Sequence, residues 1–197
     1  AIGEVLRRGK NDAAITGTNN RKFVLLGDPA ITLAYPQYQA VATTINSKPV
    51  GNGSLDTLKA LSNVTITGEV RDAQNQRLNS FNGRVYPTIF DKRVNVPTLA
   101  NDSKSPVTTF SYFRNIIFRG NVSVTNGEFA FSFYVPKDIA YQIGNGRLSL
   151  YAENGQTDAA GQTNKFFIGA IDNNAANDLT PPEVAVFIND ESFIAGG

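Results

Sequence analysis

Apolar and polar residues alternate with a period of two along most of the chain after residue 39. In 64–71, Val64, Ile66 and Val70 fall on one face and polar side chains on the other, as in a strand with one buried face. The alternation recurs in 121–125, in 128–135 with Phe129, Phe131 and Phe133 inward, in 147–153 with Leu148 and Leu150 inward, and in 183–188. This series of short strands predicts a mainly β fold, an immunoglobulin-like antiparallel β-sandwich of two sheets.

Turn-forming residues separate these runs. Asn126-Gly127 suits a type I′ turn, whose two central residues need positive φ, so we expect a hairpin between 122–125 and 128–133. Pro87 lacks a backbone N–H, which predicts that its strand, 84–90, lies at a sheet edge or beside a bulge. The prolines of Thr180-Pro181-Pro182 exclude a central strand there and predict a linker.

The start of the chain has a helical pattern. Ile2, Val5 and Leu6 lie on one side of a short amphipathic helix that Gly9 would close. The apolar runs 22–26 and 31–35 flank Gly27-Asp28-Pro29, so we expect two strands joined by a turn and ended by Pro36. These boundaries divide the chain into 1–36, a sandwich at 37–179, and a linker with the first strand of a following module at 180–197.

The composition excludes several kinds of chemistry. The 197 residues contain no Cys, His, Met or Trp, so nucleophilic catalysis by a thiol or a Ser-His pair is impossible within the chain. No catalytic or cofactor-binding residue is assigned. The formal net charge is +1 with scattered cations, which predicts no nucleic-acid partner, and no apolar run is long enough to span a membrane. From the ends of the sequence, at Ala1 and Gly197, we expect a fragment of a longer protein.

Without imidazole or thiolate ligands, any metal site would use oxygen donors, which suit calcium. Asp172, Asp178 and Asp158 carry such donors in connections between expected strands. One interpretation is a calcium ion that bridges these loops. The other is an ordinary polar connection rich in turn-forming residues, since the strict spacing of a calcium-binding loop is absent. We expect no other cofactor.

Two further groups of residues have alternative interpretations. Phe110, Tyr112, Phe113 and Phe118 are expected to fill the sandwich core, although aromatic residues can also line a groove for sugar or peptide. Asp91-Lys92-Arg93 mixes charges and is interpreted as a solvated turn, with a role in holding another domain or guiding a partner as the alternative.

Several segments, in their order along the chain, resemble segments of one known protein family. The helix at 2–6, the run 20–29 with Leu26-Gly27-Asp28-Pro29, and the run 33–36 resemble the end of the catalytic domain in the gingipain family of cysteine peptidases. The segments that resemble one branch of this family, the sortases of the type IX secretion system, are Phe81-Asn82-Gly83, Phe90-Asp91-Lys92, Ile117-Phe118-Arg119-Gly120, Val135-Pro136-Lys137-Asp138-Ile139 and Ser192-Phe193.

The resemblance implies an enzyme on the outer surface of Bacteroidetes that removes the carboxy-terminal signal of secreted cargo and attaches the new end to an anionic lipopolysaccharide. The catalytic Cys and His of the family have no counterpart here, so this piece would be a non-catalytic scaffold. Its expected partners are the catalytic domain of the same protein and a cargo or secretion-system protein. The alternative is a sandwich module of a cell-surface adhesin, which should close its own sheet with residues 1–36.

Residues 54–61 have two interpretations. Asp56-Thr57-Leu58 resembles the short sequon for O-glycosylation in Bacteroidetes. The spacing of Leu55, Leu58 and Leu61 instead favours a short helix capped by Ser54, and this is the interpretation that we adopt.

Overall fold

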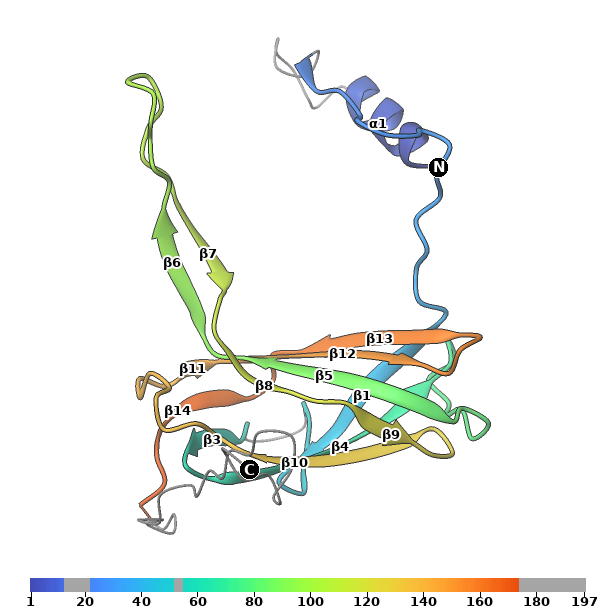
Figure 1. Cartoon of the computed structure of the whole chain (residues 1–197), viewed down its shortest axis with the longest axis vertical. Helices are drawn as coiled ribbons and strands as arrows, with labels where there is room; N and C mark the ends of the chain where they lie inside the picture. Colours follow the sequence, from blue (N-terminus) through green and yellow to red (C-terminus); the bar gives the residue numbers. More distant parts are fainter. Residues whose placement is uncertain (13–21, 52–54, 174–197) are drawn as a thin grey trace, which may run out of the picture.

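A computed structural model of the chain describes residues 1–12, 22–51 and 55–173. The fold is mainly β, with one short helix, as the alternation predicts (Figure 1). In chain order the elements are α1 (Ile2–Asn11), β1 (Tyr38–Ile45), β2 (Lys48–Pro49), β3 (Thr57–Ala60), β4 (Asn63–Arg71), β5 (Gly83–Phe90), β6 (Arg93–Pro97), β7 (Thr109–Phe113), β8 (Ile116–Arg119), β9 (Val122–Val124), β10 (Glu128–Tyr134), β11 (Gly144–Asn145), β12 (Arg147–Glu153), β13 (Asp158–Thr163) and β14 (Phe167–Ile171). Within the described ranges no helix is both long and apolar enough to cross a membrane.

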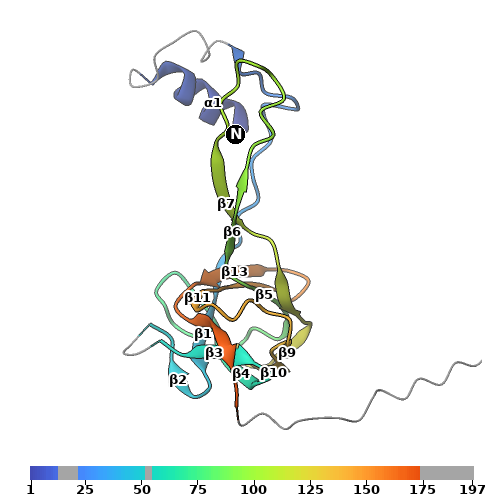
Figure 2. The ribbon, with the colours of Figure 1, turned by 90° about the vertical axis from the view of Figure 1, so that its left-hand side faces the viewer.

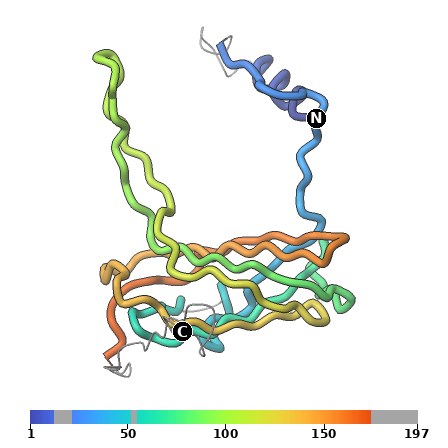
Figure 3. Tube along the Cα trace, viewed as in Figure 1, coloured from blue at the N-terminus to red at the C-terminus, as the bar shows by residue number. Residues whose placement is uncertain are grey.

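The described strands form three sheets. The largest has nine strands in the order β10-β4-β1-β13-β12-β5-β8, with β2 beside β1 and β9 beside β5. It curls into two facing layers, with β5, β12 and β13 in one and β4 and β10 in the other, while β1 runs between them (Figures 1 and 3). A second sheet has the order β11-β14-β3, and β6 pairs with β7 alone. The expected sandwich is confirmed, but the pairs β1·β13 and β14·β3 are parallel rather than antiparallel.

The core contains the side chains that the alternation turns inward. Val64, Ile66 and Val70 are fully buried, and Leu148 and Leu150 are buried on the facing layer. The three phenylalanines of β10 are also buried, as expected. Phe118 of β8 stacks on Phe131 and Phe133, with ring centroids 5.4 Å and 4.6 Å apart, so this aromatic cluster connects the two layers.

The turn at Asn126-Gly127 forms as expected, with φ of 51° and 75°. The strands on either side do not form the expected ladder, because β9 pairs with β5 and β10 pairs with β4. A single bridge, Thr125 to Glu128, joins them. The turn therefore connects the two layers of the curled sheet, a role that local sequence does not encode.

Pro87 lies within a strand that has neighbours on both sides, so its strand is not an edge. Its carbonyl oxygen accepts a hydrogen bond from the Gly120 N–H at 3.0 Å. The N and C=O of one strand residue point to the same neighbouring strand. The backbone nitrogen of Pro87, which carries no hydrogen, therefore faces the break between β8 and β9. The alternative that placed Pro87 beside an irregularity is correct.

The strands expected at 22–26 and 31–35 are absent. These apolar runs have no neighbouring strand, and Phe23, Leu26 and Tyr35 are 67%, 92% and 78% exposed. The turn between them does form, since the Ala30 N–H donates to the Asp28 carboxylate at 2.8 Å. A strand needs a hydrogen-bonding partner as well as β propensity, and none of the described residues supplies one.

The helix expected at 54–61 is also wrong, because Thr57–Ala60 is strand β3. Leu58 and Ala60 are fully buried on the same face, and Thr57 pairs with Phe167 of β14. The spacing of three leucines fits a helix, but alternation and an available partner strand decide for β. The expected linker at 180–182 and the strand at 183–188 lie outside the described residues.

Candidate functional site: a projecting hairpin and its base

The strands β6 and β7 form a hairpin that projects away from the sandwich (Figures 1 and 2). They pair from Arg93 opposite Phe113 to Pro97 opposite Thr109, and a further backbone bond joins Thr98 to Thr108 at 2.8 Å. The segment 107–113 therefore leaves the sandwich in which its aromatic residues were expected. An isolated two-stranded ladder has little stability in water, so its base must hold it in place.

One face of the hairpin is apolar and exposed. Val94 lies opposite Tyr112 and Val96 lies opposite Phe110, which puts all four side chains on the same face. The rings of Phe110 and Tyr112 stack with centroids 5.8 Å apart and are 50% and 39% exposed. The prediction that these two aromatic residues fill the core is wrong, because pairing with β6 carries them out of the sandwich.

A buried ion pair fixes the base of the hairpin. Asp91 is only 4% exposed, and its carboxylate accepts hydrogen bonds from the Lys92 backbone N–H at 2.8 Å and from Lys92 Nζ at 2.7 Å. Lys92 Nζ also donates to the carbonyl oxygens of Ala140 at 2.9 Å and Ile168 at 3.3 Å. The interpretation of Asp91-Lys92-Arg93 as a solvated turn is therefore wrong for its first two residues.

Phe113 lies at the junction of hairpin and sandwich. Its ring lies 6.1 Å from that of Phe90 and is only partly buried, so the expectation that it fills the sandwich core holds in part. The guanidinium carbons of Arg93 and Arg147 lie 5.0 Å and 5.6 Å from its centroid, within the range of cation–π attraction. Residues from β6, β7 and β12 thus meet around one ring.

The residues of the calcium hypothesis do not gather within the described part of the chain. Asp158 accepts hydrogen bonds from the Gln37 N–H at 3.3 Å and the Tyr151 hydroxyl at 3.5 Å. The N–H of Asp172 donates to Ala60 O at 3.1 Å. The start of β13 and the end of β14 lie at opposite ends of the sandwich (Figure 1), and no group of three metal-binding residues occurs among the residues described. Asp178 lies outside the described residues, and calcium stays a prediction.

Tyr151 shows how the carboxylate at Asp158 affects its surroundings. The pKa of the Tyr151 hydroxyl is raised, first by its desolvation and next by the negative charge of Asp158. The hydroxyl therefore keeps its proton over the physiological range and donates a hydrogen bond to the Asp158 carboxylate. This contact uses one oxygen of the carboxylate in a hydrogen bond.

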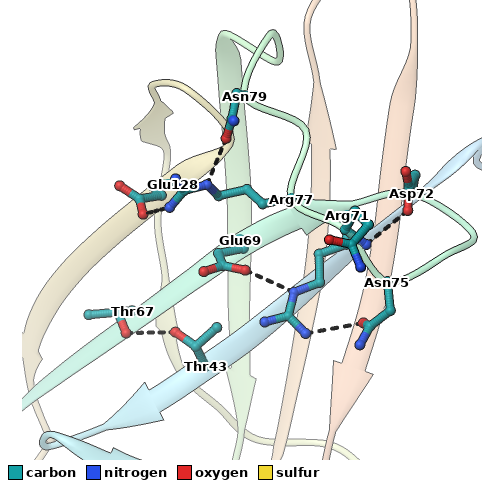
Figure 4. A network of polar contacts seen from close by, with 10 residues as sticks. Thr43, Thr67, Glu69, Arg71, Asp72, Asn75, Arg77, Asn79 and Glu128 are labelled. Atoms are coloured by element: carbon teal, nitrogen blue, oxygen red, sulfur yellow. Dashed lines mark hydrogen bonds and ion pairs between the residues drawn. The ribbon is translucent and has the colours of Figure 1, made fainter.

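The acidic side chains on the surface of β4 and β10 have cationic partners (Figure 4). Glu69 accepts from Arg71 Nε at 2.8 Å, and Arg71 also donates to Asn75 at 3.1 Å. Glu128 pairs with Arg77. These pairs are exposed or half-buried and complete their own hydrogen bonds, so this surface offers no unpaired charge for a ligand.

The sequence contains a signal for the hairpin, although the elements predicted from the alternation do not include one there. Polar and apolar residues alternate in 93–97, and they do so again in 109–112, where Phe110 and Tyr112 are the apolar residues. The segment between these two runs contains the turn-forming residues Asn101-Asp102 and Pro106. Two alternating runs around such a loop indicate a β-hairpin. Nothing in the sequence indicates that Arg147, about 50 residues later, meets it.

Comparison with solved structures finds matches, whereas comparison with family models and curated proteins does not. No protein-family model matches the chain, and neither does any curated protein. The crystal structure of dimeric latent PorU from Porphyromonas gingivalis matches over 98% of this chain and 19% of that one, with 28% identity and a TM-score of 0.66. The chain has a PorU-like fold. Spo0M, a sporulation control protein from Bacillus subtilis, matches 70% of this chain and 51% of that one at 11% identity, but its TM-score of 0.38 is too low to indicate a shared fold.

Proposed function

We propose that this chain is a non-catalytic accessory region of a type IX secretion sortase, a scaffold that docks the catalytic domain and positions cargo or a secretion-system protein. The PorU-like fold over nearly the whole chain supports this, together with the resemblance to the sortase branch of the gingipain family. The complete protein would act at the extracellular side of the bacterial outer membrane. There it would remove the carboxy-terminal signal of cargo proteins and attach them to the cell surface.

The observation that carries the scaffold role is a pair of exposed apolar arms. The hairpin β6–β7 and the segment 22–37, which leads into β1, rise from the same side of the sandwich (Figures 1 and 2). The hairpin exposes Phe110 and Tyr112, and the segment exposes Phe23, Val24 and Leu33. Because burial of each large apolar side chain is worth about 1.5–3 kcal/mol, two such arms favour a protein surface that covers them.

The same segment bears on the alternative function. A self-contained adhesin module should complete its sheet with residues 1–36, but the described residues of this range form no strand and none is buried. Instead, α1 is joined to the Pro29–Ile31 region by backbone bonds, from Ile2 N–H to Ile31 O at 2.8 Å and from Gly3 N–H to Pro29 O at 2.9 Å. Helix and segment fold on each other away from the sandwich, which favours the accessory region.

The chain by itself is expected to have no peptidase or transpeptidase activity, because it supplies neither a thiol nor an imidazole. We would incubate it with a peptide that contains a cargo signal and follow cleavage by mass spectrometry. A second purification step controls for contaminating proteases. Cleavage that persists at constant specific activity through that step would contradict the proposal.

The apolar face of the hairpin is expected to bind the catalytic domain of the same protein. The double variant F110S/Y112S should weaken this binding at least about tenfold, because it removes two half-exposed rings that the catalytic domain would bury. Calorimetric titration with the catalytic domain, expressed separately, measures the change. Tyr134→Ser is the matched control, because Tyr134 is 72% exposed but belongs to β10.

Two results would contradict this prediction. Equal affinities for the double variant and the control would show that the hairpin is not the docking surface. A gene that encodes only further sandwich modules beside this chain, with no domain containing Cys and His, would instead support the adhesin alternative.

A further inference from the structure

The two arginines around Phe113 have no anionic partner among the described residues. Neither Arg93 nor Arg147 forms an ion pair with any described residue, although their guanidinium groups approach the same ring at 5.0 Å and 5.6 Å. The Nε atom of Arg147 is buried and has no hydrogen-bond partner in the described part of the chain. A buried N–H of a charged group without a partner is costly.

Several acidic side chains of the sandwich have partners of opposite charge, unlike these two arginines. Glu69 and Glu128 each have an arginine partner, and the buried Asp91 is occupied by Lys92. The charged residues that line the clefts beside Phe113 are all cations: Lys92, which is paired with Asp91, and Arg93, Arg147 and Lys165, which form no ion pair with a described residue. Like charges held close together raise the free energy of the unliganded state, and a bound anion would lower it.

Arg93, Arg147 and Lys165 line two adjoining clefts. The smaller, of about 210 Å³, is lined by Arg93, Phe113, Arg147, Gln162, Thr163 and Asn164. The larger, of about 580 Å³, shares Arg93, Phe113 and Asn164 with it and adds two lysines, Lys165 and the paired Lys92. Amide and hydroxyl groups therefore lie beside the cations, and they can donate hydrogen bonds to an oxyanion.

We propose that the base of the hairpin is a binding site for a phosphate group, either a free ion or a phosphomonoester. Two guanidinium groups and one ammonium group match the charge of a phosphate, about −1.5 to −2 near neutral pH, better than the single charge of a carboxylate. The planar fork of each guanidinium suits two phosphate oxygens at once. This site does not depend on the proposed sortase function, because all of its residues belong to the described hairpin and sandwich.

Titration of the full chain with inorganic phosphate tests this site. We expect saturable binding by NMR, with shifts concentrated at 162–165 and at the base of β6. Arg147→Gln and Arg93→Gln should each weaken binding about tenfold, because each removes charge-assisted hydrogen bonds. Arg119→Gln is the matched control, since Arg119 is an exposed cation of β8 away from both clefts, and it should leave binding unchanged.

Further measurements identify the ligand and control for misfolding of the variants. Tighter binding of glycerol phosphate than of inorganic phosphate would identify an ester as the ligand, and the reverse order would identify the free ion; both results support the site. Acetate that binds as tightly as phosphate would overturn the proposal, as would equal loss in Arg147→Gln and Arg119→Gln. Arg93 is exposed, so Arg93→Gln is expected to fold and keeps the test decisive if Arg147→Gln does not.

Discussion

Replacement of Phe131 by alanine is expected to lower the free energy of unfolding by about 3–5 kcal/mol. Phe131 is 8% exposed, and its ring stacks on Phe118 of the facing layer with centroids 5.4 Å apart. Truncation would leave a cavity at the contact between layers, and a close-packed core fills such a cavity only partly. Urea denaturation followed by tyrosine fluorescence and circular dichroism measures the change.

Phe110→Ala is the matched control for this prediction. It removes the same side chain from a strand, but Phe110 is 50% exposed on the hairpin, so the loss should stay below about 1 kcal/mol. Similar losses at the two positions would mean that Phe131 does not form part of the core, and that the inward face of β10 is assigned wrongly.

Lys92→Met is expected to destabilise the chain by about 3–5 kcal/mol, because it leaves the carboxylate of Asp91 buried without its cation. The side chains of Asp91 and Lys92 are only 6% and 16% exposed, so water compensates little. The variant also removes the bonds from Lys92 to Ala140 and Ile168, which hold the hairpin base to the sandwich. Denaturant unfolding gives the global loss, and amide exchange in β6 and β7 reports loosening of the hairpin.

An exposed pair provides the comparison. Lys48 and Asp56 lie 2.7 Å apart, but the lysine side chain is 56% exposed, so Lys48→Met should cost less than about 1 kcal/mol. The double variant D91N/K92M should regain part of the loss, because a neutral amide replaces the unpaired charge. If Lys92→Met and Lys48→Met have equal effects, the Asp91–Lys92 pair does not anchor the hairpin.

The predictions that failed share a physical cause. The runs 22–26 and 31–35 have the composition of strands, and 54–61 has the spacing of a helix, but each outcome depended on whether a partner strand was available. Thr57–Ala60 pairs with β14, which lies more than 100 residues later in the chain, whereas the two N-terminal runs have no partner strand among the described residues. Local propensity is weaker than such pairing, so it cannot decide these cases alone.

The candidate site could be predicted from the sequence only in part. Alternation in 93–97 and 110–112 around a polar loop indicates a hairpin, and its apolar residues could have been recognised. The burial of the Asp91–Lys92 pair could not, because the carbonyl groups that accept hydrogen bonds from Lys92, those of Ala140 and Ile168, come from distant parts of the chain. The same holds for Arg147, which reaches Phe113 from β12.

Three features follow from neighbouring residues alone: the mainly β fold, the inward faces of β4, β10 and β12, and the turn at Asn126-Gly127. Each depends on a period of two or on the φ preference of adjacent residues. Three others required the folded chain: this turn joins two layers, Pro87 faces a break between strands, and Arg93 and Arg147 meet at Phe113. These features arise from contacts between residues far apart in the chain, and such contacts form only when the sheet curls and brings those residues together.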